Sequence, residues 1–519
     1  METGSPERNR HKTSKSSARL AQLISSSDRK RARDPDPEST HKVKRFRKKK
    51  SYGEHDEAEK EKKKKKKKEK KEKKEKKKKD KHKESGKASE EATAVKRKHV
   101  PEDKAKTRTK KSNDGLLPIL DAQYELKYVV KGHADRTLQQ TRELEDDEDV
   151  NLWACEFEPE QDSDVVAICG ANNVLFLDAQ KGTFVKKYTH PEAKEEFLCL
   201  AWTKLRGPSD LMDDDAAEDD ICTILATAGR LGSVKLINYI QNECYRYLFG
   251  HQRQIHRMLF HKNYKRWLFT ASDDMSIRLW DIGSPAKERK GSICLGKFAV
   301  PASASVPASM SMAPDNTYLM VGCTDGHMLR YNISRQTMLA LEDRSKDEKQ
   351  PMQTLRPNIL YPDGDEWHDG YIDDIYVLGQ TSAEAKHKLD GCIVSRGTDD
   401  YETIVWNPET STLEDADILL SFEWPDSDGY SGTRFKVIEQ NGKKAMVAGD
   451  YEGHIRIFDI GDTPFSKTLE DNSKEQHPEK KLLSHSLSRR LVRDVSCSSD
   501  TSILVSVNSG NDIFVWHEK

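Results

Sequence analysis

Short runs of apolar and β-branched residues, separated by turn residues, follow one another from about Tyr124 to Lys519. Runs of this kind, bounded by Gly, Asp, Asn and Ser, are typical of the strands of an all-β fold. The pattern predicts a repeated sheet unit rather than an alternation of strands and helices. There are seven such units, whose first predicted strands begin at Leu152, Phe197, Ile255, Ala308, Asp374, Phe435 and Val492.

The unit with the most regular pattern starts at Gly250-His251 and continues through Ile255–Phe260 and Arg266–Asp274 to Ser276–Asp281. This order resembles a WD repeat, in which a Gly-His start and a Trp-Asp end enclose four strands. The sequence thus predicts an all-β, seven-bladed WD40 β-propeller. The units average about 57 residues, above the usual 40–45. We attribute the excess to insertions at Ser209–Asp220, Glu342–Trp367 and Asp462–Lys480.

The last unit ends on its third predicted strand, at Trp516, and lacks a fourth. A separate β-rich run, Tyr124–Val130, precedes the first unit. We expect this run to complete the last blade, because a closed ring leaves no unpaired edge.

Four polar or aromatic residues of the regular unit stand where WD repeats carry a hydrogen-bonded chain: His251, Thr270, Asp274 and Trp280. A buried network whose members are all satisfied fixes one conformation of a blade. We therefore interpret His251 and Asp274 as structural residues and not as catalytic ones.

Residues 1–114 lack the strand pattern and carry almost no bulky apolar residues after Leu20, Leu23 and Ile24. Residues 1–111 hold 43 Lys and Arg against 20 Asp and Glu, a net charge of +23, whereas the remainder carries −23. Such a segment cannot bury enough apolar surface to offset the entropy of ordering. We predict a disordered, lysine-rich tail at residues 1–114, followed by a propeller domain at residues 115–519.

Two basic clusters in this tail are candidates for nuclear import and for contact with nucleic-acid phosphates. Lysine binds phosphate without reading the base, and the tail lacks interleaved aromatic residues that would stack on unpaired bases. A tail that only keeps the protein soluble is the alternative. The candidate residues are Lys44, Arg45, Arg47, Lys48, Lys49, Lys50, Lys62, Lys63, Lys64, Lys65, Lys66, Lys67 and Lys68.

Motifs of enzymes and metal sites are absent from the sequence. It contains no phosphate-binding G-x-x-x-x-G-K-[ST], no H-E-x-x-H and no G-x-S-x-G. The acidic runs Glu143–Asp149 and Asp213–Asp220 lack the ligand spacing of a calcium loop. We expect no enzymatic activity, no cofactor, no metal and no small-molecule substrate. No apolar stretch approaches the roughly 20 residues that span a bilayer, so no membrane association is expected.

Several stretches of the body resemble known WD proteins: Leu152–Phe157, Glu195–Thr203, Leu225–Asn238 and Leu268–Gly283. They are similar to the WD portion of the leucine-rich-repeat and WD-repeat family, which is associated with the origin recognition complex. More distantly, they resemble the embryonic ectoderm development family of the Polycomb methyltransferase complex. The resemblance covers residues 123–519. It implies a non-enzymatic role on chromatin, in the nucleus, with histone tails or chromatin-complex subunits as partners.

The Polycomb resemblance also implies a peptide-binding face with an aromatic cage for methylated lysine. The three cage positions fall on Trp153, Leu198 and Gly432, so only the first is aromatic here. The alternative interpretation of Trp153 is a residue that packs within its blade. Two arginines match arginines near that face, and the alternative interpretation of each is an ion pair with a carboxylate of the body. The candidate peptide-binding residues are Trp153, Phe197, Leu198, Tyr430, Arg434 and Arg493.

Three functions are compatible with these features. The first is a chromatin-associated scaffold or reader, in which the acidic body attracts basic histone tails and the tail adds affinity for nucleic acid. The second is a nucleolar scaffold for ribosome assembly or RNA processing. A substrate adaptor of a ubiquitin ligase ranks last, because no W-D-x-R ends a blade; Ile282-Gly283 follows Trp280-Asp281.

Overall fold

The computed structural model describes most of the predicted propeller and none of the lysine-rich tail. The chain divides into one unit at Met1–Lys111 and a second at Ser112–Lys519, which holds every described residue. The predicted tail boundary and all of the tail's candidate residues lie outside the described residues. Described are residues 117–132, 151–159, 163–205, 222–285, 291–347, 350–364, 367–379, 388–398, 400–425, 432–440, 442–464 and 476–519.

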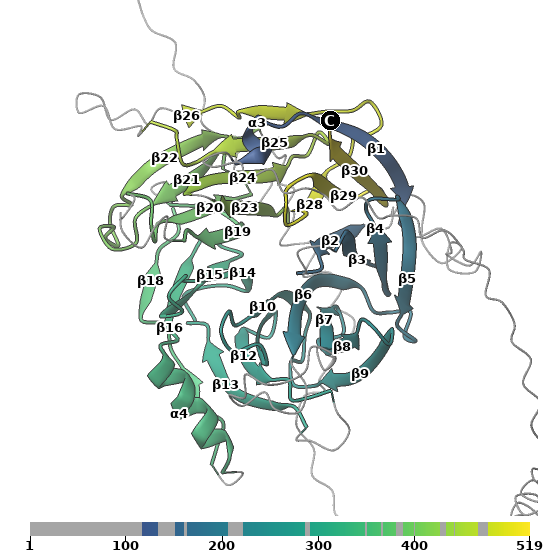
Figure 1. Ribbon diagram of the computed structural model, residues 1–519. Coiled ribbons are helices and arrows are strands. Elements are labelled where there is room, and N and C mark those ends of the chain that lie inside the picture. Colours follow the sequence, from purple (N-terminus) through teal and green to yellow (C-terminus); the bar gives the residue numbers. More distant parts are fainter. Residues whose placement is uncertain are drawn as a thin grey trace, which may run out of the picture. The chain divides into compact units, whose positions relative to one another are not determined.

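Seven sheets of mostly antiparallel strands are arranged in a ring, so the predicted seven-bladed propeller is confirmed (Figure 1). The first three blades each begin with their innermost strand and end with an outer one. Blade 1 consists of β2 (Leu152–Phe157), β3 (Val165–Gly170), β4 (Asn173–Asp178) and β5 (Thr183–Thr189). Blade 2 consists of β6 (Phe197–Leu205), β7 (Cys222–Gly229), β8 (Val234–Asn238) and β9 (Glu243–Leu248). Blade 3 consists of β10 (Ile255–Phe260), β11 (Trp267–Ser272), β12 (Ser276–Asp281), β13 (Ile293–Ala299) and β17 (Thr354–Leu355).

The remaining blades follow the same plan, with small additions at their outer edges. Blade 4 consists of β14 (Pro307–Met312), β15 (Tyr318–Cys323), β16 (Met328–Asn332) and β18 (Ile359–Tyr361). Blade 5 consists of β19 (Ile372–Val377), β20 (Ile393–Gly397), β21 (Glu402–Trp406), β22 (Ile418–Glu423) and β26 (Gln476–His477). Blade 6 consists of β23 (Phe435–Gln440), β24 (Lys443–Gly449), β25 (Ile455–Asp459) and β27 (Lys481–Leu483). Blade 7 consists of β28 (Val492–Cys497), β29 (Ile503–Asn508), β30 (Asp512–Glu518) and β1 (Tyr124–Lys131).

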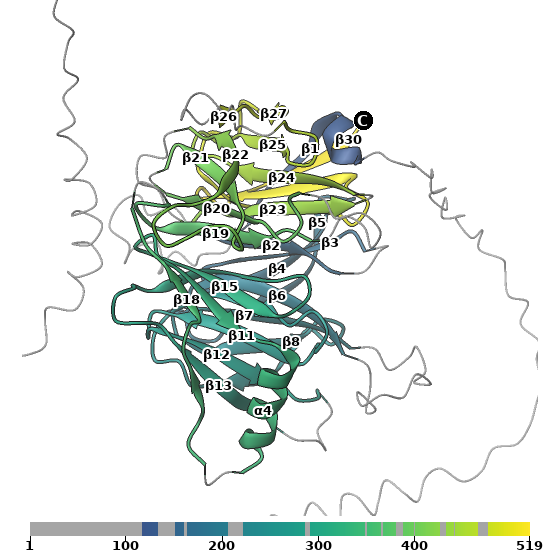
Figure 2. The same ribbon diagram turned by 90° about the vertical axis from the view of Figure 1, so that its left-hand side faces the viewer.

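The strand order places three kinds of segment on one face of the ring: the starts of the innermost strands, the turns between second and third strands, and the connections between blades. Because the strands of a blade alternate in direction, the innermost strand begins on the face where the second strand turns into the third. The connections between successive blades lie on this face as well. We call it the entry face (the ring is seen from its side in Figure 2).

Six of the seven innermost strands share a bulge near their start. In β2, the pairing with β3 shifts between Leu152 and Ala154, which leaves Trp153 as the extra residue. A bulge leaves such a residue without a ladder partner and redirects its side chain. The bulged strands therefore hold a set of redirected residues at the entry face, namely Trp153, Leu198, His256, Ala308, Asp373 and Arg493.

Apolar residues between neighbouring blades form the core. All six residues of β11 are buried, because both faces of its sheet are covered by adjacent blades. The ring continues across its junction, where Leu152 and Ile168 of blade 1 pack in one cluster with Val505 and Val515 of blade 7. Each blade therefore depends on its two neighbours for burial.

The chain closes the ring with its first described strand, as predicted. Strand β1 pairs antiparallel with β30 over Tyr124–Lys131, so it supplies the fourth strand of blade 7. The side chain of Tyr124 packs in the same apolar cluster as Trp516, and its hydroxyl donates to Thr501 O at 2.5 Å.

The predicted insertion at Glu342–Trp367 contains structure that the sequence pattern did not indicate. The helix α4 (Arg335–Ser345) runs into it and buries Met338 and Leu341 in the cluster of blades 3 and 4. Downstream of the helix, β17 extends blade 3 and β18 completes blade 4. The other described helix is the short α3 (Pro118–Asp121). Neither described helix is long and apolar enough to cross a bilayer.

Removal of residues 1–131 is expected to destabilise the propeller, whereas removal of residues 1–116 is not. The longer deletion removes α3 and β1. It exposes the edge of β30 and the apolar cluster in which Tyr124 packs. We expect a loss of at least about 3 kcal/mol from the buried apolar surface alone. Thermal unfolding by circular dichroism, with size-exclusion chromatography, compares the two deletions. Equal unfolding midpoints would show that β1 is dispensable.

Candidate functional site

The four predicted network residues of blade 3 lie in one chain of hydrogen bonds. Trp280 Nε1–H donates to Thr270 Oγ1 at 3.0 Å, and the Thr270 hydroxyl donates to His251 Nε2 at 2.6 Å. His251 Nδ1–H then donates to Asp274 Oδ2 at 2.9 Å. Burial lowers the pKa of His251, which agrees with a neutral ring that accepts at one nitrogen and donates at the other.

A second network of the same kind lies in blade 5. Trp406 Nε1–H donates to Ser395 Oγ at 3.0 Å, the Ser395 hydroxyl donates to His368 Nε2 at 2.8 Å, and His368 Nδ1–H donates to Asp400. Sequence reasoning missed it because His368 follows a Trp instead of a Gly, and Asn407 replaces the Asp after the strand Trp. The signal that remained for this network was the order of residue types: a histidine, then a strand hydroxyl, an aspartate and a strand Trp.

Ser395, His368 and Asp400 are linked in the same order as the residues of a hydrolytic triad, but they are enclosed within the blade. The side chains of Ser395 and His368 are buried, and the Ser395 oxygen already accepts from Trp406. A nucleophile must reach a substrate in a cleft, and this hydroxyl is enclosed by its own blade. Both networks therefore fix blade conformation.

Arg434 reaches across the middle of the ring. Its Nη2 donates to the backbone oxygens of Leu198 in blade 2, at 2.8 Å, and of His256 in blade 3, at 3.4 Å. Its Nη1 lies 3.5 Å from Asp494 Oδ2 of blade 7. Burial opposes the charge of this guanidinium, yet Asp494 and its other acidic neighbours raise the pKa of Arg434. This peptide-binding candidate thus lies within the ring and ties four blades together.

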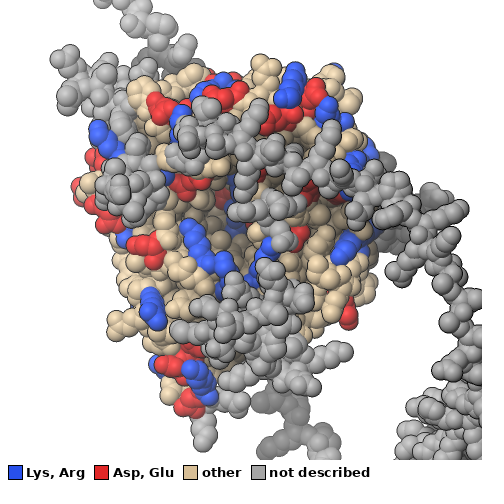
Figure 3. Space-filling model, in the orientation of Figure 1, with Lys and Arg blue, Asp and Glu red and all other residues tan. Residues whose placement is uncertain are grey.

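Further charged side chains share the middle of the ring with Arg434. Arg257 Nη2 donates to both oxygens of Asp374, at 2.7 and 3.0 Å. Asp494 also accepts from the backbone N–H of Cys155 at 3.0 Å, while burial raises its pKa. Figure 3 shows Lys and Arg side chains around the hollowed middle of one face of the ring. The buried carboxylates therefore depend on arginines that come from other blades.

Trp153 and Arg493 meet at the entry face, although 340 positions separate them in the chain. The Arg493 Cζ lies 4.5 Å from the centroid of the Trp153 ring, within the range of a cation–π contact. An added side-chain carbon at Gly432 would lie 3.7 Å from both residues, so the third cage position borders the same pair. One face of the only cage aromatic is therefore occupied by the protein's own cation.

The other peptide-binding candidates have different places. Phe197 is fully buried and packs near Tyr188 and His190, and Leu198 is almost fully buried. Tyr430 lies outside the described residues. The structure thus brings Trp153 and Arg493 together at the entry face and places Phe197 in the core.

A polar chain that sequence reasoning missed holds Trp153 in position. Its Nε1–H donates to Glu196 Oε1 at 2.9 Å, and Arg230 Nη2 lies 2.5 Å from Glu196 Oε2. Glu196 lies in the connection before blade 2, and Arg230 lies in the turn after β7. Arg230 is exposed and lies beside Trp153 on the entry face, where a ligand can reach it.

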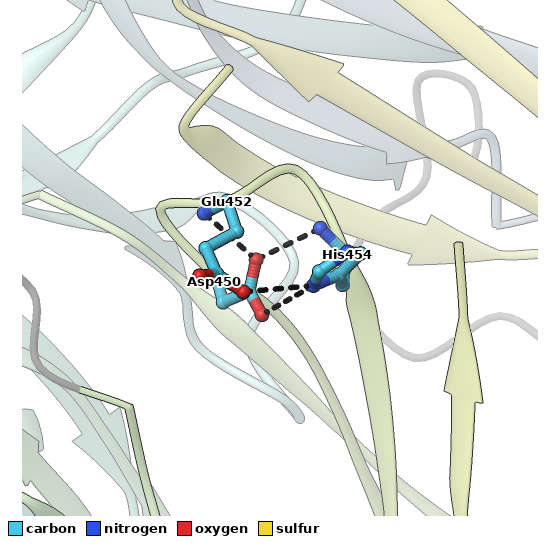
Figure 4. Close-up of side chains that lie close together, drawn as sticks. All are labelled: Asp450, Glu452 and His454. Atoms are coloured by element: carbon cyan, nitrogen blue, oxygen red, sulfur yellow. Dashed lines mark hydrogen bonds and ion pairs between the residues drawn. The ribbon is translucent and has the colours of Figure 1, made fainter. Parts of the chain in front are cut away.

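Among the described residues, Asp450, Glu452 and His454 form the group whose ligand atoms lie close enough to hold a metal ion (Figure 4). The Asp450 carboxylate is already satisfied. Its Oδ1 accepts from the backbone N–H of Glu452 and His454, at 3.0 and 2.8 Å, and its Oδ2 accepts from Arg456 Nε at 3.0 Å. A metal ion would face this guanidinium, so we interpret Asp450 as the residue that fixes the turn.

Replacing Arg434 with Met is expected to cost about 3 kcal/mol of unfolding free energy at neutral pH, because Asp494 stays buried without its cation. The pKa of Asp494 is already raised by burial and would rise further. Since the folded state then binds a proton that the unfolded state releases, the loss shrinks as pH falls through that raised pKa. Urea unfolding at about pH 8 and about pH 5 tests this. A loss that does not depend on pH would refute the role of Asp494.

Comparison with known proteins relates the chain to two groups of WD proteins. The family model described as "Leucine-rich repeat and WD repeat-containing protein 1, WD domain" matches residues 134–338. The mouse protein of that name is 25% identical over 386 residues, which cover 71% of this chain and 55% of the relative. The Xenopus tropicalis protein is 28% identical over 323 residues, covering 60% and 42%. The chain thus spans about half the length of these curated relatives.

Polycomb proteins form the second group. Polycomb protein esc of Drosophila virilis is 22% identical over 376 residues, covering 68% of this chain and 77% of the relative. A chain in the crystal structure of the Chaetomium thermophilum Polycomb repressive complex 2 superposes with a TM-score of 0.58 at 14% identity. It covers 77% of this chain and 98% of that chain, which shows a shared fold. The resemblance of this propeller to the WD domain of leucine-rich repeat and WD repeat-containing protein 1, and more distantly to the Polycomb WD proteins, is therefore confirmed.

Proposed function

We propose that the chain is a non-enzymatic, chromatin-associated WD-repeat scaffold of the nucleus. Its partners are histone tails or subunits of chromatin complexes, which it helps to recruit to chromatin. The observation that carries this proposal is the relation of the propeller to two WD groups, one of them named as Polycomb proteins. The buried His–Ser/Thr–Asp networks support the non-enzymatic part of the proposal. Their residue types also occur in the triads of hydrolases, but here they hold the strands of a blade together.

The entry face is the surface that we propose for a partner peptide. Trp153 offers aromatic area, Arg493 lies against its ring, and the exposed Arg230 offers guanidinium donors nearby. Trp and Arg are the residue types that contribute most to protein interfaces. A peptide crossing from blade 7 to blade 2 would meet all three side chains.

The position of Arg493 limits which peptide groups suit this face. A methylated lysine needs a free aromatic surface, and Arg493 covers one side of Trp153. The incoming cation would also meet the positive charge of that guanidinium. We propose that recognition here uses the indole edge and the donors of Arg230 rather than an aromatic cage.

The lysine-rich tail would add affinity for nucleic acid. Its net charge of +23 over residues 1–111 suits phosphate contacts that carry no sequence information, and the same clusters suit nuclear import. The body, with a net charge of −23, attracts basic peptides over distances up to the screening length.

Affinity purification of the tagged chain from nuclease-treated nuclear extract, followed by mass spectrometry, tests the proposal. Histones together with subunits of chromatin complexes are expected among the retained proteins. Recovery of ribosome-assembly factors without histones would overturn it and favour a nucleolar scaffold.

Replacing Trp153 with Ala is expected to weaken binding of histone-tail peptides by at least about 10-fold, as for a central interface aromatic. Arg230→Gln is expected to weaken it less, through loss of one donor. Lys181→Gln is the matched control. Lys181 also lies 2.5 Å from a carboxylate, that of Asp178, but on the opposite face. Fluorescence anisotropy measures the affinities; equal effects of Arg230→Gln and Lys181→Gln would show that only overall charge matters.

A further inference from the structure

A pocket of about 590 Å³ opens on the entry face between blades 6 and 7. One wall is the turn that carries Glu452 and His454, between β24 and β25. The other wall is the connection from β27 to β28, with Ser484, His485, Ser486 and Arg489. The two walls are joined by the buried Ser488 hydroxyl, which donates to Gly453 O at 2.6 Å.

Hydrogen-bond donors of one wall face the pocket. His485 Nδ1 accepts from the backbone N–H of Leu487 at 3.2 Å, so the proton of the neutral ring lies on Nε2. Arg489 Nε donates to Ser486 O at 2.7 Å, which leaves its two Nη groups as donors for a ligand. The hydroxyls of Ser484 and Ser486 lie on the same connection. An imidazole N–H, a guanidinium and two hydroxyls are the donors that hold a phosphoryl group in proteins.

The opposite wall has an acceptor. His454 Nδ1–H donates to Asp450 Oδ2 at 3.2 Å and lies 3.4 Å from Glu452 Oε2. Asp450 is buried and satisfied, whereas about half of the Glu452 side chain is exposed at the pocket. Glu452 is therefore placed to accept a hydrogen bond from a basic group that enters beside the anion.

We propose that this pocket binds the phosphoryl group of a phosphorylated serine or threonine in a partner peptide. Arg489, His485 and the Ser484 and Ser486 hydroxyls hold the phosphoryl oxygens, and Glu452 pairs with a basic residue next to the modified one. The inference rests on the proposed function only in taking the partner to be a peptide.

Two features favour a peptide over a nucleic acid as the source of the phosphoryl group. A polynucleotide carries a phosphate on every residue, and Glu452 would repel the second one. Leu487 lies on the same connection with 62% of its surface exposed, which offers an apolar contact to a neighbouring side chain.

Fluorescence anisotropy with the full chain tests the proposal. The probe is a labelled peptide with one phosphoserine followed by lysine, and its unphosphorylated form is the comparison. The phosphopeptide is expected to bind at least about 10-fold more tightly, and Arg489→Gln is expected to remove that difference. Arg490→Gln is the matched control, since Arg490 is also exposed but packs over Gly510 instead of lining the pocket. Glu452→Gln is expected to weaken binding of this phosphopeptide, because its lysine then loses the carboxylate that it pairs with.

Equal binding of the two peptides overturns the proposal, and so do equal effects of Arg489→Gln and Arg490→Gln. Competition with inorganic phosphate separates the two sources of the anion. If inorganic phosphate displaces the labelled phosphopeptide only at concentrations far above those at which unlabelled phosphopeptide does, a peptide site is supported. If both competitors displace it at the same concentration, the proposal is overturned. Unchanged thermal unfolding of each variant shows that the fold is intact. Phosphopeptide binding without histone recovery from nuclear extract would overturn the proposed function and leave this pocket assignment standing.

Discussion

Closure of the ring is the constraint on which the rest of the structure depends. A blade buries both faces of its sheet only between two neighbours, so a ring with a gap would leave two sheets half uncovered. Here β1 pairs with β30, and residues of blades 1 and 7 share one apolar cluster. The same closure brings Arg493 of the last blade against Trp153 of the first. The site at the entry face therefore exists only in the closed ring.

Charges inside the ring show why a residue type alone does not reveal a role. Arg434 lies in a position that the Polycomb resemblance links to peptide binding, yet it donates to carbonyls of blades 2 and 3. A buried arginine without such acceptors would be costly, and a buried Asp494 without a cation would be equally so. Arg434 therefore joins the neighbouring blades 6 and 7 through Asp494 and reaches across the ring to blades 2 and 3 through two backbone oxygens.

The sequence predicted those features that depend on local pattern. Strands such as Leu152–Phe157 and Ser276–Asp281 have the predicted bounds, because a short apolar run and the turn residues beside it are visible within a few positions of the sequence. The network around His368 escaped prediction, since its Gly-His and Trp-Asp signals are both changed. The contact of Trp153 with Arg493 escaped as well, because it depends on how the ring closes and not on spacing along the chain.

Both parts of the entry face present arginine side chains, Arg493 beside Trp153 and Arg489 in the pocket between blades 6 and 7. Trp153, the one aromatic residue at a cage position, is already covered by an internal cation, so it offers little to an external one. Four residues before that cation, Arg489 and its neighbours present donors in an open pocket. Guanidinium and imidazole N–H groups form strong hydrogen bonds with oxyanions such as phosphate, whereas aromatic faces bind ammonium groups. The entry face therefore presents arginine side chains where an aromatic cage would need free ring surface, although the propeller fold is shared.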